Sequence, residues 1–94
     1  MGRDADKKLW LIAFGATISE RRNYVAMTQQ QLADNSGVHR TYISDIERGS
    51  RNVTVTTVNR IAAALETTAA RIFFQTDKKH LELKSLTVAD AEAK

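Results

Sequence analysis

Hydrophobic positions recur along most of this chain at intervals of three and four residues, the spacing of one face of an α-helix. The first such segment runs from about Asp6 to Val25 and ends near Arg21 and Arg22, cations that the helix dipole favours at that end. Gly15 weakens this prediction, because a glycine inside a helix costs about 1 kcal/mol relative to alanine. The pattern as a whole still predicts one long first helix.

Two short helices with well-marked ends follow. Thr28 and Gln31 have the spacing of a capping box, in which each side chain bonds the other residue's backbone amide, so a helix is expected over residues 29–35. Gly37 supplies the left-handed conformation that ends it, and a second short helix is expected over about 39–48. Two helices joined this closely outline a helix-turn-helix, whose second helix reads the major groove of DNA.

The rest of the chain predicts two more helices, which gives an all-α fold. Thr54 caps a strongly amphipathic segment that runs to Leu65, and a last short helix is expected through about Phe74. The tail, residues 77–94, alternates only weakly between apolar and polar positions. A strand, a partner-binding segment and frayed chain are the open alternatives for it.

At 94 residues, the chain is expected to form a single small domain with a thin core, which a partner subunit would help to stabilise. We divide it into an N-terminal extension of the first helix (1–13), a helix-turn-helix domain with a dimerising last helix (14–76) and a short C-terminal tail (77–94). The formal net charge of +3 arises within residues 1–76 and favours a polyanionic partner. No apolar stretch approaches the roughly 20 residues that cross a bilayer, so a cytoplasmic, nucleoid-associated protein without a membrane partner is expected.

Catalytic, cofactor and metal sites have no supporting motif. The chain has no cysteine, which excludes disulfide scaffolds and cysteine-ligated zinc, and His39 and His80 are too far apart to suggest a metal site by spacing. It has neither a phosphate-binding glycine loop nor a nucleophile motif of the known hydrolases. We therefore expect no enzymatic activity, no cofactor and no bound metal.

The second of the two short helices has two faces of different character. Its apolar stripe consists of Tyr42, Ile43 and Ile46. The opposite side carries side chains that can hydrogen-bond to bases: Arg40, Thr41 and Ser44. The fork of an arginine can donate two hydrogen bonds to guanine, a contact worth about 1–3 kcal/mol of base discrimination. These three residues are the candidate base contacts, and an ordinary solvated helix face is the alternative.

Several pieces of the sequence together resemble the phage repressor/Cro-type (XRE) helix-turn-helix family. They are Gly15-x-x-Ile18, Met27-Thr28-Gln29-x-x-Leu32-Ala33, Gly37-Val38, Tyr42-Ile43-Ser44-x-Ile46-Glu47-x-Gly49 and Ile61-Ala62-x-Ala64-Leu65. Residues 40–54 are more narrowly similar to controller proteins of restriction–modification systems, and also to small regulators on mobile elements. The resemblance implies a five-helix, repressor-like regulator of transcription. Such a protein is a homodimer that binds inverted-repeat operators near its own promoter and represses, activates or does both.

The resemblance also assigns roles to individual residues. Arg22 and Glu47 match a partly buried ion pair of some relatives, and Gln29 should bind a phosphate while bracing the recognition helix. The residues expected at the DNA backbone or minor groove are Thr28, Gln29, Tyr42, Arg48, Ser50, Arg51 and Asn52. Three positions depart from the family: Arg21 stands where leucine is frequent, His39 replaces the usual serine or threonine cap, and Val53 replaces a loop proline.

Self-association is expected at the last helix, through Ile72, Phe73 and Phe74, because two adjacent phenylalanines cannot both point inward from one short helix. Double-stranded DNA and a second copy of the chain are the expected partners, and RNA polymerase is a further candidate. The alternative from another class of function is an antitoxin or antiactivator. Such a protein would use the same fold to hold a protein partner through Phe73, Phe74 and the tail.

Overall fold

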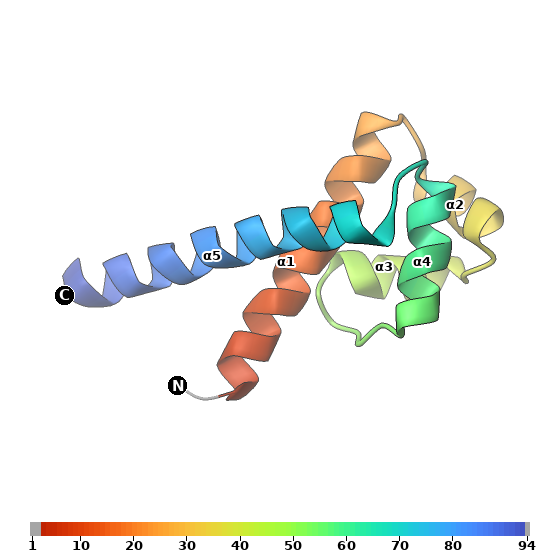
Figure 1. Ribbon diagram of the computed structural model, residues 1–94. Coiled ribbons are helices and arrows are strands. Elements are labelled where there is room, and N and C mark those ends of the chain that lie inside the picture. The colour runs from red at the N-terminus through yellow and green to blue at the C-terminus, as the bar shows by residue number, and fades with distance from the viewer. Residues whose placement is uncertain (1–2, 94) are drawn as a thin grey trace.

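Five α-helices follow one another in the computed structural model, which describes the backbone of residues 3–93 and the side chains of residues 3–86 (Figure 1). They are α1 (Arg3–Tyr24), α2 (Gln29–Ser36), α3 (Arg40–Glu47), α4 (Val55–Ala64) and α5 (Ala69–Ala93). The all-α fold is confirmed over this part of the chain. Residues 1–2 of the expected N-terminal extension and residue 94 of the tail lie outside the described residues.

The core is made by the first four helices together with the start of α5. Its largest fully buried hydrophobic side chains are Phe14, Ile18, Leu32, Ile43, Ile46, Ile61 and Leu65. Because α2 packs on both α3 and α4 while α3 packs on α1, burial of these side chains fixes the helix-turn-helix against the rest of the molecule. The face of α3 opposite the core remains exposed.

The helix ends follow the capping signals in the sequence. The Gln31 amide donates to Thr28 Oγ1 over 3.0 Å and the Thr28 amide donates to Gln31 Oε1 over 2.8 Å, so the capping box is confirmed. Gly37 ends α2 with a φ of 72°, as expected. His39, in place of the usual cap, accepts through Nδ1 from the Thr41 amide at 3.1 Å, and α3 begins one residue later. Both ends of α2 and the start of α3 are thus capped by hydrogen bonds.

Gly15 lies where α1 crosses the end of α3. A Cβ atom at this position would stand 2.3 Å from the carbonyl oxygen of Ile46 and 2.7 Å from that of Glu47. Glycine is therefore the residue that lets the two helix backbones approach this closely. The same residue weakened the helix prediction, because helix propensity does not register a contact between helices.

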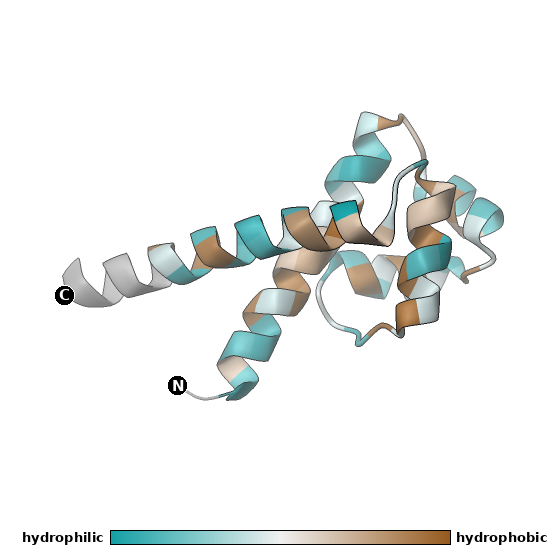
Figure 2. Ribbon diagram, in the orientation of Figure 1, coloured by the Kyte–Doolittle hydropathy of each residue, from teal (hydrophilic) through white to brown (hydrophobic). Residues whose placement is uncertain are grey.

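The prediction that the last helix ends near Phe74 is wrong, because α5 continues without interruption to Ala93. At 25 residues it is about 37 Å long, and it projects beyond the other helices (Figure 1). The molecule with α5 included measures 46 × 22 × 20 Å. Figure 2 shows hydrophobic positions where α5 crosses α1 and a more hydrophilic stretch beyond. Residues 77–93 are thus neither a strand nor a separate tail.

Ion pairs with α1 support this continuation. Lys79 lies 2.6 Å from Glu20, and Asp6 lies 3.1 Å from His80 Nε2 and 3.3 Å from Lys84. The hydrogen bond from Lys84, with a smaller contribution from His80, holds the pKa of the Asp6 carboxyl below its usual value. These partners are distant in sequence, so no local pattern indicates that they hold α5 beyond Phe74.

We expect Gly15→Ala to lower the free energy of unfolding by about 2 kcal/mol, because the added methyl group overpacks the crossing of α1 and α3. Urea denaturation followed by circular dichroism measures this. Ala63→Gly, at an exposed position of α4, is the reference for the effect of helix propensity alone. It should lower the free energy of unfolding by about 1 kcal/mol. A Gly15→Ala variant that is more stable than the wild type would contradict the close crossing.

Candidate nucleic-acid interface

The outward face of α3 gathers the three candidate base contacts. Arg40 and Thr41 are exposed in its first turn, and Ser44 lies half-buried one turn further on. On the opposite side, Ile43 is 0% exposed and Ile46 is 1% exposed. The prediction that this helix has one buried and one exposed face is therefore confirmed. The first turn of a recognition helix is the part that meets base edges in the major groove.

Glu47 joins three helices at the end of α3. Arg22 of α1 donates from Nε to Glu47 Oε2 over 2.7 Å and from Nη2 to Oε1 over 3.0 Å. The two side chains are only 14% and 8% exposed, and the hydrogen bond to Glu47 raises the pKa of Arg22 above its ordinary value. The ion pair that the family resemblance implied is confirmed.

Gln29 connects this ion pair to the outward face of α3. Its Nε2 donates to Glu47 Oε1 over 3.0 Å, and its Oε1 accepts from Arg40 Nη1 over 3.3 Å. Arg40 is therefore oriented through Gln29 by the carboxylate that also binds Arg22. These two hydrogen bonds hold the recognition helix against α2, as expected of Gln29. The contact of Gln29 with a phosphate stays a prediction.

Asp45 holds the arginines that follow α3. Its carboxylate accepts from Arg48 and, over 2.8 Å, from Arg51 Nη2. Arg48 also donates to Ser44 Oγ over 2.7 Å. The hydrogen bond from Arg51 and the positive charge of Arg48 hold the pKa of the Asp45 carboxyl below its usual value, so this cluster stays ionised at neutral pH. Three residues expected to contact DNA are thus bonded together around one carboxylate.

The loop between α3 and α4 is anchored on α3. The Tyr42 hydroxyl donates to the carbonyl of Asn52 over 3.1 Å, and the guanidinium of Arg51 lies 4.7 Å from the centre of the Tyr42 ring. Ser50 Oγ donates to the carbonyl of Asp45 over 3.1 Å. The candidate backbone contacts in this loop therefore stand beside the candidate base contacts, on one side of the molecule. Thr28, at the start of α2, uses its hydroxyl oxygen in the capping box.

The three residues expected at a dimer interface have different surroundings. Ile72 is 3% exposed and packs in the core of its own chain, and its contact with a second copy stays a prediction. Phe73 is half-buried, with its ring centre 6.0 Å from that of Trp10 and 6.3 Å from that of Phe14. Phe74 is 63% exposed, in agreement with the expectation that one of the two phenylalanines points outward.

Two residues of this surface were not identified from the sequence. One is Asp45, although its spacing to Arg48 is that of an ion pair along a helix. Arg60 of α4 donates to the carbonyls of Ser36, over 3.1 Å, and Gly37, over 2.8 Å. It fixes the turn between α2 and α3 from a helix two elements away, and nothing in the local sequence indicates it.

Within residues 3–86, no set of three or more carboxylate, imidazole or thiol groups is placed to bind a metal ion. None of the helices, over the part of the chain that is described, combines the length and apolar character needed to cross a membrane.

Comparison with known proteins gives matches over the same region. The family described as Helix-turn-helix matches residues 18–72. Control protein C.SmaI of Serratia marcescens is 47% identical over 51 residues, 54% of this chain and 61% of that protein. Control protein C.BamHI of Bacillus amyloliquefaciens is 44% identical over 55 residues, 57% of this chain and 68% of that protein. The match thus spans less than two thirds of the first of these relatives.

A solved structure extends the similarity to nearly the whole length of a relative. The restriction–modification controller protein C.Esp1396I, a tetramer in complex with its natural 35 base-pair operator, superimposes with a TM-score of 0.70 at 38% identity. The superposition covers 95% of that chain but 77% of this one. The present chain therefore has structure beyond what it shares with that relative.

We expect Glu47→Ala to lower the free energy of unfolding by about 3 kcal/mol, because it leaves the charge of Arg22 with little solvent and no carboxylate partner. Chemical denaturation measures the change. Glu82→Ala, at an exposed position of α5, is the matched control. Equal stability losses for the two variants would contradict a structural role for Glu47.

We expect Asp45→Asn to raise the affinity for random-sequence duplex DNA about threefold to tenfold at low salt, because it frees two arginines and removes a negative charge near the phosphates. Fluorescence anisotropy across a salt series measures it. Asp77→Asn, on exposed α5, changes the net charge equally and should have little effect. Equal gains for both variants would show that net charge alone is responsible.

Proposed function

The chain belongs to the helix-turn-helix family, and from this premise we propose that it is a sequence-specific DNA-binding regulator of transcription. The observation that carries the proposal is the outward face of α3, on which Arg40 and Thr41 are exposed while the opposite side of the helix is buried. With α3 in the major groove, the guanidinium of Arg40 reads guanine and Thr41 and Ser44 contact bases or neighbouring phosphates.

The DNA backbone is held from both sides of α3. Thr28 and Gln29 stand at the start of α2, where backbone amides and the helix dipole favour a phosphate. Arg48, Ser50, Arg51 and Asn52 approach the backbone or the minor groove on the other side. Arg48 and Arg51 exchange Asp45 for phosphates when they bind. Affinity then depends strongly on salt, whereas specificity depends on Arg40.

The regulator acts as a homodimer on an operator with inverted half-sites. Two copies related by a two-fold axis place their α3 helices in successive major grooves, about 34 Å apart on one face of the duplex. The operator-bound tetramer of C.Esp1396I supports self-association on DNA. By analogy with control proteins, the operator lies near the protein's own promoter, in the cytoplasm or nucleoid. We also propose that the bound regulator contacts RNA polymerase. It represses or activates transcription, or does both.

The test is selection of operators from random duplex DNA, followed by binding measurements on single-base variants of the selected site. We expect a palindromic consensus, and we expect Arg40→Ala to lower specific affinity at least about tenfold and to relax preference at one base pair per half-site. Arg71→Ala, an exposed cation of α5, is the control and should leave both unchanged. Failure to enrich any consensus would overturn the proposed function.

A further inference from the structure

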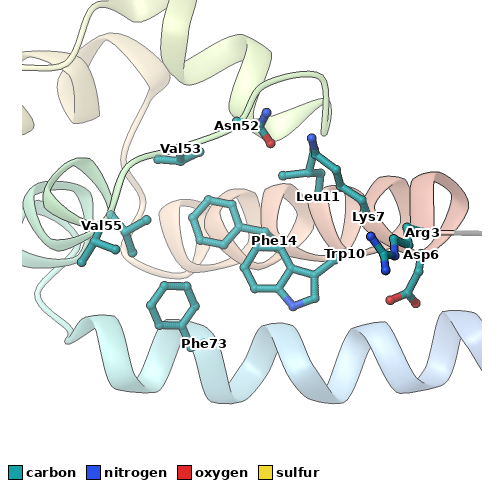
Figure 3. A pocket seen from close by; sticks show the side chains of 11 residues that line it. Arg3, Asp6, Lys7, Trp10, Leu11, Phe14, Asn52, Val53, Val55 and Phe73 are labelled. Carbon is teal, nitrogen blue, oxygen red and sulfur yellow. The ribbon is translucent and has the colours of Figure 1, made fainter.

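The first turns of α1 lie beside the loop that joins α3 to α4 (Figure 3). Arg3, Lys7 and Leu11 follow one another at intervals of four residues, so they share one side of α1. These three side chains line a pocket of about 480 Å³ together with Asn52 and Val53 of the loop. The side of α1 that carries two cations therefore faces the loop that is proposed to approach the DNA backbone.

These two cations have no carboxylate partner of their own. Arg3 and Lys7 are exposed, and neither forms an ion pair with any residue in the described part of the chain. Asp6 also borders the pocket, but its carboxylate lies 3.1 Å from His80 Nε2 and 3.3 Å from Lys84 on α5. The negative charge of Asp6 is thus balanced by α5 rather than by the two cations beside it.

The arginines that follow α3 are in the opposite situation. Arg48 and Arg51 are both bonded to Asp45, so part of their charge is neutralised before DNA binds. Arg3 and Lys7 are therefore the cations beside this loop that can bind a phosphate without giving up a carboxylate. Duplex DNA carries one negative charge per about 1.7 Å of its axis, so a long cationic side chain next to a bound stretch of backbone meets a phosphate.

On the basis of the proposed function, we infer that Arg3 and Lys7 each bind a phosphate of the DNA backbone beside the α3–α4 loop. Both residues lie outside residues 18–72, the segment that matches the family, so the first turns of α1 extend the DNA contact beyond the helix-turn-helix. Contacts with phosphates carry no sequence information of their own. The two cations therefore add affinity for operator and random DNA alike and leave the discrimination between them to α3.

The salt dependence of DNA binding tests each contact separately. Every phosphate that a protein neutralises adds about 0.9 to the slope of log affinity against log salt concentration, so Lys7→Gln and Arg3→Gln should each lower that slope by about this amount. The double variant should lower it by about twice as much. At low salt, we expect Lys7→Gln to weaken binding to random-sequence duplex DNA about threefold to tenfold, measured by fluorescence anisotropy. The fold is safe, because glutamine suits an exposed helix position.

Lys8→Gln is the matched control, because it removes the same charge from the next residue of α1. Lys8 is exposed but does not border the pocket, and it lies roughly 100° further around the helix, four residues after Asp4. We expect Lys8→Gln to leave the slope unchanged, and Lys7→Arg, which keeps the charge, to retain both the slope and the affinity of the wild type. Equal losses for Lys7→Gln and Lys8→Gln would show that net charge alone is responsible and would overturn the inference.

Measurements on the selected operator separate this inference from the proposed function. If Lys7→Gln weakens binding to operator and random DNA by the same factor and lowers both slopes, both proposals are supported. If the wild type prefers the operator but Lys7→Gln binds every duplex as the wild type does, only the inferred contact fails. A loss confined to the operator would place Lys7 at a base edge and overturn the assignment to a phosphate. If no operator is enriched, the proposed function fails, whereas the slopes on random DNA still decide the role of the two cations.

Discussion

The carboxylate of Glu47 is the contact on which the arrangement of this molecule depends. A helix of eight residues such as α3 has little stability of its own and takes its orientation from what it packs against. Glu47 binds Arg22 of α1 and Gln29 of α2, and Gln29 in turn bonds Arg40. The close backbone crossing at Gly15 brings α1 to the same end of α3. One partly buried carboxylate therefore positions the side chain proposed to read DNA.

Features with a local cause were predictable from the sequence, and features with a distant cause were not. The capping box of Thr28 and the left-handed Gly37 are set by residues within one turn, so the helix-turn-helix could be placed to within one or two residues. The Arg22–Glu47 pair came from the family resemblance, because its partners lie 25 positions apart. The continuation of α5 is supported by pairs such as His80 with Asp6, 74 positions away, which no local signal indicates.

The proposed DNA-binding surface carries its own counter-charge when DNA is absent. Asp45 forms ion pairs with Arg48 and Arg51, the two arginines that are proposed to bind phosphates. The carboxylate organises both side chains before binding, which reduces the entropy lost on the DNA, but it must also give them up. A well-placed phosphate compensates for the lost ion pair, whereas a poorly placed one does not. Asp45 thus favours discrimination over general affinity for DNA.

The two exposed apolar regions of the molecule need not serve the same partner. The flank at Val55 adjoins the α3–α4 loop, whereas Phe74 and Leu81 lie on the side of α5 opposite the buried Ile72 and Thr76. Protein binding through Phe74, the alternative expected from the sequence, would therefore use a surface other than the outward face of α3. The superposition with the controller structure covers 77% of this chain, so the regulator carries structure in addition to the fold that the two proteins share.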